Sequence, residues 1–180
     1  MEQSRQWSVS RSTTVKVAPE QAYSLISDPT RTGEWSPENT GASLRESAQG
    51  SLREGDEFDG TNKRGPFRWI TRCTVTHAVP GKRFRFKVRR WGVGLPLLRV
   101  PVATWDFELE PTDGGTRITE TWTDDRRAWP DSLCRIVDPM LTGQRSFADF
   151  NARNIESSLK RMKKQLEDGG HESRPSILEP

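Results

Sequence analysis

Residues 147–166 read FADFNARNIESSLKRMKKQL, and apolar side chains recur along this stretch at helical spacing. The positions that share this face are Phe147, Phe150, Asn151, Asn154, Ile155, Leu159, Met162 and Leu166. Gly169 and Gly170 follow, as glycines commonly do where a helix ends. We therefore expect one long helix near the C-terminus, and its apolar face needs a surface to pack against.

That surface is predicted by the preceding residues, which alternate apolar and polar side chains at the period of β-strands. We expect strands over residues 7–17, 42–46, 57–62, 67–79, 83–90, 102–110 and 115–123. The segment 111–115, Pro-Thr-Asp-Gly-Gly, is a strong hairpin signal between the last two. Two short helices should follow the first strand, one opened by Pro19 and one capped by Asp28. A shorter apolar stripe, Leu133 to Leu141, contains Pro139, which should bend or break a helix there.

Only the long C-terminal helix can cover a sheet of this size, because the other predicted helices are short. The predicted fold class is therefore α+β: a curved antiparallel sheet of about seven strands around a long C-terminal helix, with two short helices after the first strand. We expect a single domain over residues 1–168. Residues 169–180 are polar and carry no helical or strand pattern, so we expect a disordered tail.

The composition argues against several functional classes. Two Cys and two His among 180 residues show no zinc-ligand spacing, and no Ser-His-Asp or Cys-His arrangement is evident, so we expect no metal and no cofactor. No apolar run approaches the roughly 20 residues that cross a bilayer, and the first residues do not resemble a signal peptide. We therefore expect a cytoplasmic protein without a transmembrane segment.

Basic residues gather in two places, although the net charge is only +3. In residues 82–90 the cations alternate with Phe and Val, which favours a half-buried strand over a nucleic-acid surface. The second cluster, residues 160–164, lies on the predicted long helix. It is either a solvated outer face or a surface that docks an acidic partner or a membrane.

Several short segments, taken in order, carry a family resemblance. They are Val15–Tyr23, Ile26–Pro29, Gly33–Pro37, Phe58–Asn62, Arg68–Trp69, Thr104–Phe107 and Gly114–Trp122. With this order and spacing the chain resembles the SRPBCC superfamily, also called START-like or Bet v 1-like, and within it the polyketide cyclase/dehydrase branch. The resemblance implies a helix-grip fold, whose members bind or transfer lipids, bind plant hormones, cyclise polyketides or assist chaperones. Cyclase members use Arg, Tyr and Ser side chains for which this chain has no matching motif; its one tyrosine is Tyr23.

Alternation along the strands predicts which side chains point toward the helix and enclose a ligand. The candidate ligand-binding residues are Trp35, Phe58, Asn62, Trp69, Thr71, Cys73, Phe86, Trp105, Phe107, Glu120, Trp122, Phe147, Phe150, Asn151 and Asn154. These aromatic residues either line a pocket or simply fill a core. We expect the mouth of the pocket near Trp35, the loop 92–96 and Pro139.

Glu120 is the unusual member of this set. It lies two residues from both Ile118 and Trp122, on the same face of the strand, so its carboxylate should point inward. A buried carboxylate either has a raised pKa or pairs with a cation such as Arg72 or Arg153. Two functions remain open. The chain carries a small hydrophobic ligand (a lipid, polyketide or aromatic metabolite) that Glu120 and Asn62 orient. Alternatively it is a cyclase- or dehydratase-like enzyme in which Glu120 is a general acid/base and Asn62 polarises a carbonyl.

Overall fold

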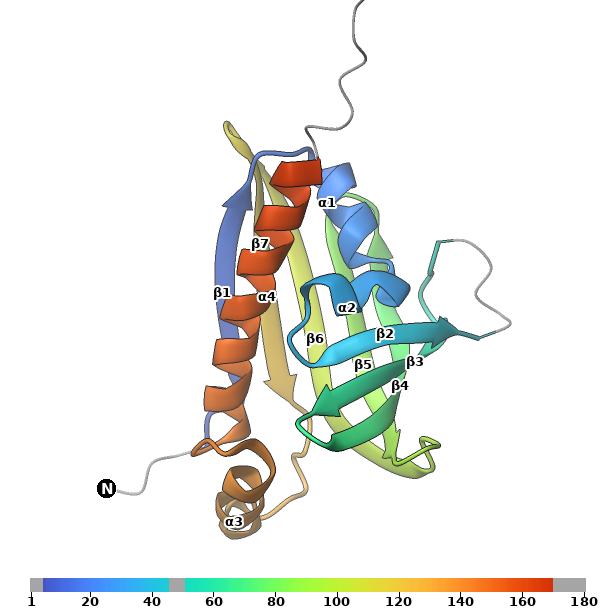
Figure 1. Cartoon of the computed structure of the whole chain (residues 1–180), viewed down its shortest axis with the longest axis vertical. Helices are drawn as coiled ribbons and strands as arrows, with labels where there is room; N and C mark the ends of the chain where they lie inside the picture. Colours follow the sequence, from blue (N-terminus) through green and yellow to red (C-terminus); the bar gives the residue numbers. More distant parts are fainter. Residues whose placement is uncertain (1–4, 46–50, 170–180) are drawn as a thin grey trace, which may run out of the picture.

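The structure is a computed structural model that describes residues 5–45 and 51–169. Seven strands form one antiparallel sheet in the order β1-β7-β6-β5-β4-β3-β2 (Figure 1). The strands are β1 Ser8–Val15, β2 Asn39–Leu44, β3 Glu57–Arg64, β4 Phe67–Val79, β5 Arg83–Gly92, β6 Leu98–Thr112 and β7 Gly115–Asp124. The helices are α1 Pro19–Ile26, the 3-10 turn η1 Pro29–Arg31, α2 Thr32–Trp35, α3 Asp131–Thr142 and α4 Phe147–Gly169. The predicted α+β fold is confirmed.

Local sequence explains where the helices begin and end. Pro19 occupies the first turn of α1, where its missing N–H costs nothing. The Asp28 carboxylate accepts a hydrogen bond from the Thr30 N–H at 3.0 Å and so caps η1, as expected. Helix α3 continues past Pro139 to Thr142, so of the two expected effects of this proline, a bend or a break, the break does not occur. Gly143, with a φ of 66°, ends that helix in the left-handed conformation.

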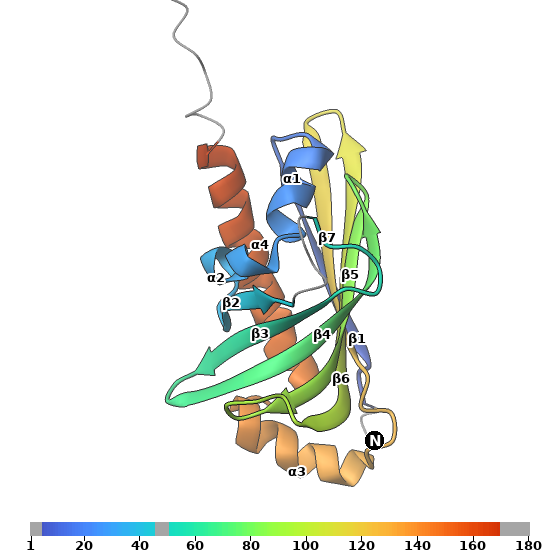
Figure 2. The same cartoon turned by 90° about the vertical axis from the view of Figure 1, so that its right-hand side faces the viewer.

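Helix α4 lies along one side of the sheet, where it packs mainly against β1 and β7 (Figures 1 and 2). The Arg11–Glu156 ion pair joins β1 to the helix, and the Lys163 ammonium donates to the Thr14 carbonyl at 2.8 Å. On its other flank the helix contacts α2, and the Arg161 guanidinium donates to the Ser36 carbonyl at 3.2 Å. The helix is therefore held from two sides.

One half of the space between α4 and the sheet is filled by a solid core. Helix α1 packs against β5, β6 and β7 at that end, and the Tyr23 ring meets Phe84 edge-on at 6.4 Å. The buried side chains here include Val15, Leu25, Ile26, Phe84, Leu109, Ile118, Met162 and Leu166. This apolar burial is the main source of stability for the fold.

Toward the other end the sheet curves, as Figure 2 shows along β4 and β5. The pairing of β4 with β5 shifts register at Arg72/Cys73 and again at Val75/His77, and β5 with β6 shifts at Val88/Arg90. Each irregularity places more residues in one strand than in its partner, which bends the strand and increases its twist. The curvature leaves space between this half of the sheet and α4.

Two earlier expectations are only partly covered by the structure. Residues 170–180 lie outside the described part of the chain, so the tail and the single-domain assignment over residues 1–168 stay predictions.

None of the helices within residues 5–45 and 51–169 is long and apolar enough to span a membrane.

Candidate functional site

The space between the curved half of the sheet and α4 is a cavity of about 590 Å³. This volume lies within the roughly 300–1,000 Å³ typical of small-molecule sites. Aromatic side chains dominate its wall: Trp35, Phe58, Phe67, Trp69, Phe86, Trp91, Trp105, Phe107, Trp122 and Phe147. The interior is thus open at this end and solid near α1.

The cavity is lined by fourteen of the fifteen residues that strand and helix alternation selected. The exception is Phe150, whose ring lies 4.1 Å from the Arg64 guanidinium carbon and is half-buried. Alternation therefore locates the wall correctly, because side chains on one face of a strand share a parity. That these residues bind a ligand remains a prediction.

Glu120 lies at the boundary between the solid core and the cavity, opposite Phe107 in the β6–β7 ladder. Its side chain is 1% exposed, and its Oε2 atom accepts no hydrogen bond from any residue that the structure describes. Burial raises the pKa of this carboxyl well above its ordinary value, because water no longer solvates the charged form. Burial therefore favours the neutral form of Glu120, and that form has an O–H that it can donate.

Neither cation proposed as a partner for Glu120 reaches it. Arg72 instead forms a bidentate pair with Asp59, with N–O distances of 2.8 and 2.9 Å. Arg153 is on the exposed side of α4. The alternative in which Glu120 ties the sheet to the helix through an ion pair is therefore wrong.

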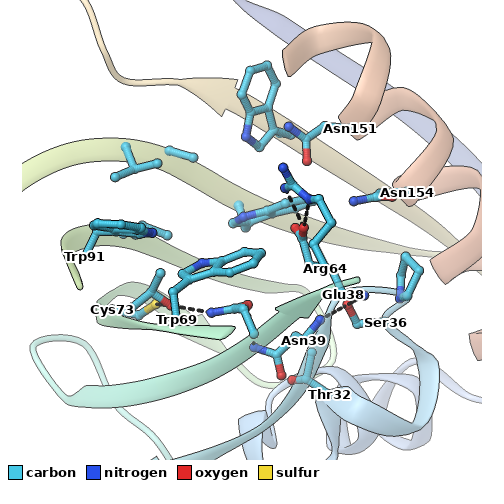
Figure 3. Close-up of a pocket in the computed structure, with 18 of the residues that line it drawn as sticks. Thr32, Ser36, Glu38, Asn39, Arg64, Trp69, Cys73, Trp91, Asn151 and Asn154 are labelled. Atoms are coloured by element: carbon cyan, nitrogen blue, oxygen red, sulfur yellow. Dashed lines mark hydrogen bonds and ion pairs between the residues drawn. The ribbon is translucent and has the colours of Figure 1, made fainter. Parts of the chain in front are cut away.

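Asn62 lines the cavity, but its amide is already engaged by the protein. Its Nδ2 donates to the Gly60 carbonyl and to the Thr71 hydroxyl, both at 3.2 Å, and its Oδ1 accepts from Asn39 at 3.3 Å. No N–H of this amide remains for a ligand. Two amides on α4, Asn151 and Asn154, also face the cavity (Figure 3).

An ion pair that the sequence analysis missed lies at the cavity. Arg64, on β3, meets the Glu38 carboxylate at 2.5 Å (Figure 3) and donates to the Leu141 carbonyl, in the last turn of α3, at 2.5 Å. Burial raises the pKa of Glu38 although the Arg64 charge opposes this. The Arg64 guanidinium also lies 5.3 Å from the Trp69 ring centroid. Arg64 thus connects β3, β4 and the residue that precedes β2 to α3 across one end of the cavity.

A strand-end error explains why Arg64 was overlooked. Alternation in the sequence predicts that this strand ends at Asn62, whereas β3 continues to Arg64. Positions 58, 60, 62 and 64 share one parity, so a strand longer by two residues would have predicted Arg64 as a lining residue. Trp91 was missed for another reason: the register shift at Val88/Arg90 changes the face on which later β5 residues lie.

The cavity opens at the end where α3, the β3–β4 hairpin and the loop between β5 and β6 lie. Phe67, Val93, Met140 and Leu141 line it and are also exposed to solvent. The loop and the region of Pro139 therefore border the mouth, as expected. Trp35 does not, because it is buried edge-on against Phe107 with ring centroids 5.9 Å apart.

The chemistry available in the cavity is limited. Burial raises the pKa of the Cys73 thiol to about 12, so it is protonated at neutral pH and is no nucleophile. Within residues 5–45 and 51–169, no group of three or more His, Cys, Asp or Glu residues could hold a metal ion. What remains is an apolar, aromatic space with a few hydrogen-bonding groups.

Comparison with known proteins places this geometry in context. Residues 6–167 match the model of a family described as polyketide cyclase / dehydrase and lipid transport. No curated protein matches the sequence.

Solved structures share the fold. A START superfamily protein from Mycobacterium smegmatis has a TM-score of 0.63 at 14% identity, covering 91% of this chain and 99% of its own. A Polyketide_cyc-like protein from Corynebacterium glutamicum has a TM-score of 0.53 at 25% identity, covering 93% and 95%. A protein from Nitrosomonas europaea, with a TM-score of 0.63 at 15% identity, covers 92% and 97%.

Proposed function

We propose that this chain, which belongs to the polyketide cyclase / dehydrase and lipid transport family, binds and carries a small hydrophobic ligand in the cavity between its sheet and α4. The observation that carries the proposal is the unfilled aromatic space beside an otherwise close-packed core. Protein interiors normally leave few voids larger than a water molecule. A cavity of this size is maintained at a cost in stability, and an apolar ligand that fills it offsets that cost.

Glu120 gives the ligand an orientation. As a neutral acid on the cavity wall it donates one hydrogen bond, so it favours a ligand with a carbonyl, ether or hydroxyl oxygen at the inner end. An anionic group there would meet the same lack of water that keeps the carboxyl neutral. The amide of Asn154, and the second N–H of Asn151, whose Nδ2 already donates to the Phe147 carbonyl at 2.9 Å, are better placed to add a second polar contact than Asn62, which has no free N–H.

Native mass spectrometry of the full chain, purified from cells without a stripping step, tests the proposal. We expect a co-purified small molecule on the wild type and its loss from Ala103→Phe, which adds a ring at a buried cavity position. Ala128→Phe adds the same ring on the exposed surface and should keep the molecule. Equal occupancy of the two variants would contradict the proposal.

The raised pKa of Glu120 favours a second function, in which this carboxyl is the general acid/base of a cyclase- or dehydratase-like reaction. Glu120→Gln separates the two. A carrier holds a molecule of the same mass in wild type and variant, with altered occupancy. A dehydrating enzyme would leave the variant holding a molecule heavier by one water than the one on the wild type.

A further inference from the structure

The mouth of the cavity is surrounded by apolar side chains that the fold does not bury. Phe67 at the β3–β4 turn, Val93 in the β5–β6 loop and Met140 on α3 are 73%, 76% and 79% exposed. Leu95, Leu97, Leu98, Leu133, Ile136 and Leu141, from the same loop and helix, are exposed as well. We call these nine residues the apolar rim. Exposed apolar groups this concentrated indicate an interaction surface.

The rim is concentrated at one end of the molecule. Figures 1 and 2 both place α3, the β3–β4 hairpin and the start of β6 opposite α1. Phe67, Val93, Met140 and Leu141 also line a single cavity, so the three segments border one opening. The apolar stripe of α3, which a helix normally turns toward the core, here faces outward.

The β5–β6 loop has a defined shape that displays its apolar side chains. A Cβ atom on Gly92 would collide with the Leu95 carbonyl, so only glycine fits there. Gly94 has a φ of 78°, in the left-handed region, and the Leu97 N–H donates to the Leu95 carbonyl at 2.9 Å. Pro96 is buried beneath the exposed residues. The backbone conformation of the loop thus exposes Val93, Leu95 and Leu97 to solvent.

The charge around the rim is strongly positive. The rim segments, residues 63–68, 89–99 and 131–145, hold eight Lys or Arg and two carboxylates, Asp131 and Asp138, and one of these cations, Arg64, is paired with Glu38. Asp138 is buried and paired with Arg126 at 2.8 Å. The whole chain carries only +3, so the remainder is net negative. Positive charge is therefore gathered where the apolar side chains are exposed.

We infer that the apolar rim docks on an anionic phospholipid bilayer, with α3 and the β5–β6 loop in the headgroup region and the cavity mouth facing the lipid. Apolar side chains interspersed with cations can insert into the fluid interface of a bilayer, because such an interface does not require a complementary shape. Each Lys or Arg near an anionic surface contributes about 1 kcal/mol. A second copy of the chain is disfavoured, because two strongly positive faces would repel each other.

If the proposed carrier function holds, docking would let an apolar ligand pass between bilayer and cavity without crossing water. The docking itself does not depend on that function, since it rests on the rim alone.

Flotation of the full chain with lipid vesicles tests the inference, because it reads membrane binding and not ligand binding. The vesicles are phosphatidylcholine alone or phosphatidylcholine with about one third phosphatidylglycerol. We expect binding to the mixed vesicles that weakens as salt is added, and much weaker binding to phosphatidylcholine.

Matched variants locate the surface. Met140→Asp should lower vesicle partitioning by about tenfold or more, whereas Val79→Asp, with the same change in net charge at an exposed apolar position of the β4–β5 turn, should not. Arg99→Glu should lower it about fivefold or more, while Lys82→Glu, with the same change in net charge, should have little effect.

Three results would overturn the inference: no binding to mixed vesicles, equal loss with rim and control variants, or a stable dimer in solution that Met140→Asp disrupts. The last result would assign the rim to contact between copies. Circular dichroism of each variant verifies that the fold is intact.

Discussion

Replacing Glu120 with glutamine should change the pH dependence of stability in a defined direction. In the folded chain burial holds the pKa of Glu120 well above its ordinary value, whereas in the unfolded chain the carboxyl is in water. At any pH between these two values, unfolding releases a proton, so raising the pH favours the unfolded state. The stabilising contribution of neutral Glu120 is therefore complete below its ordinary pKa and is lost as the pH rises through the folded-state pKa.

The size of the effect follows from the number of protons released. One proton per molecule lowers the free energy of unfolding by about 1.4 kcal/mol for each pH unit between the unfolded and folded pKa values. Glutamine has nearly the same shape and does not ionise, so Glu120→Gln removes this slope. The buried carboxamide can change the free energy of unfolding only by the same amount at every pH, so it does not alter the difference in pH dependence between wild type and Glu120→Gln.

Urea unfolding followed by tryptophan fluorescence, at a series of pH values from about 5 upward, measures the slope. Five of the seven tryptophans line the cavity, so the signal reports on this region. Glu110→Gln on β6, where the side chain is exposed, is the matched control for the chemical change. A wild-type-to-Glu120→Gln difference that stays constant with pH, or that grows toward acid, would refute the account of Glu120 as a buried neutral acid.

Three further outcomes are expected. Gly33→Ala should lower the urea midpoint by the equivalent of about 1–3 kcal/mol, because the new Cβ would lie 2.8 Å from the Thr40 carbonyl carbon; a midpoint equal to wild type would show that α2 shifts freely. Arg64→Met should cost about 1–3 kcal/mol in the same assay by leaving the Glu38 carboxylate without its partner, and the loss should shrink in the double variant with Glu38→Gln. In a Cys134→Ser variant, Cys73, with its pKa raised to about 12, should resist a thiol-specific chromophoric reagent at mildly alkaline pH until the chain is denatured; rapid labelling of that native variant would contradict the burial of Cys73.

The sequence predicts the sheet and the cavity wall well because both depend on strict periodicities. Alternation at period two assigns a face to each strand residue without knowledge of the partner strand, and the limits of β4 are predicted to the residue. Helical spacing likewise predicts the buried face of α4. Phe150 belongs to that predicted face but packs against Arg64 and does not line the cavity, because the face is wider than the cavity. The solvent-facing stripe of α3 was not foreseen, since spacing reveals an apolar face but not what covers it.

The features that escaped prediction are tertiary. Arg64 pairs with Glu38 and reaches the Leu141 carbonyl, residues distant in sequence that only the curved sheet brings together. Register shifts such as that at Val88/Arg90 have no sequence signature here, yet they reverse the parity of every later residue in the strand. The size of the cavity depends on these bends and so lies beyond any single-strand pattern.

The open half of the interior has a cause that is visible on α4 itself. Over the solid core this helix presents long apolar side chains such as Leu159, Met162 and Leu166, whereas over the cavity it presents Asn151, Asn154 and Ser158. These shorter side chains do not reach the bent part of the sheet, and the helix cannot move closer because β1, β7 and α2 hold it in place. Collapse would also bury the half-buried Asn154 amide against aromatic rings, at a cost in unsatisfied hydrogen bonds. The void is thus maintained by a rigid support and a polar helix face together, and lengthening Ser158 should close it without disturbing the core.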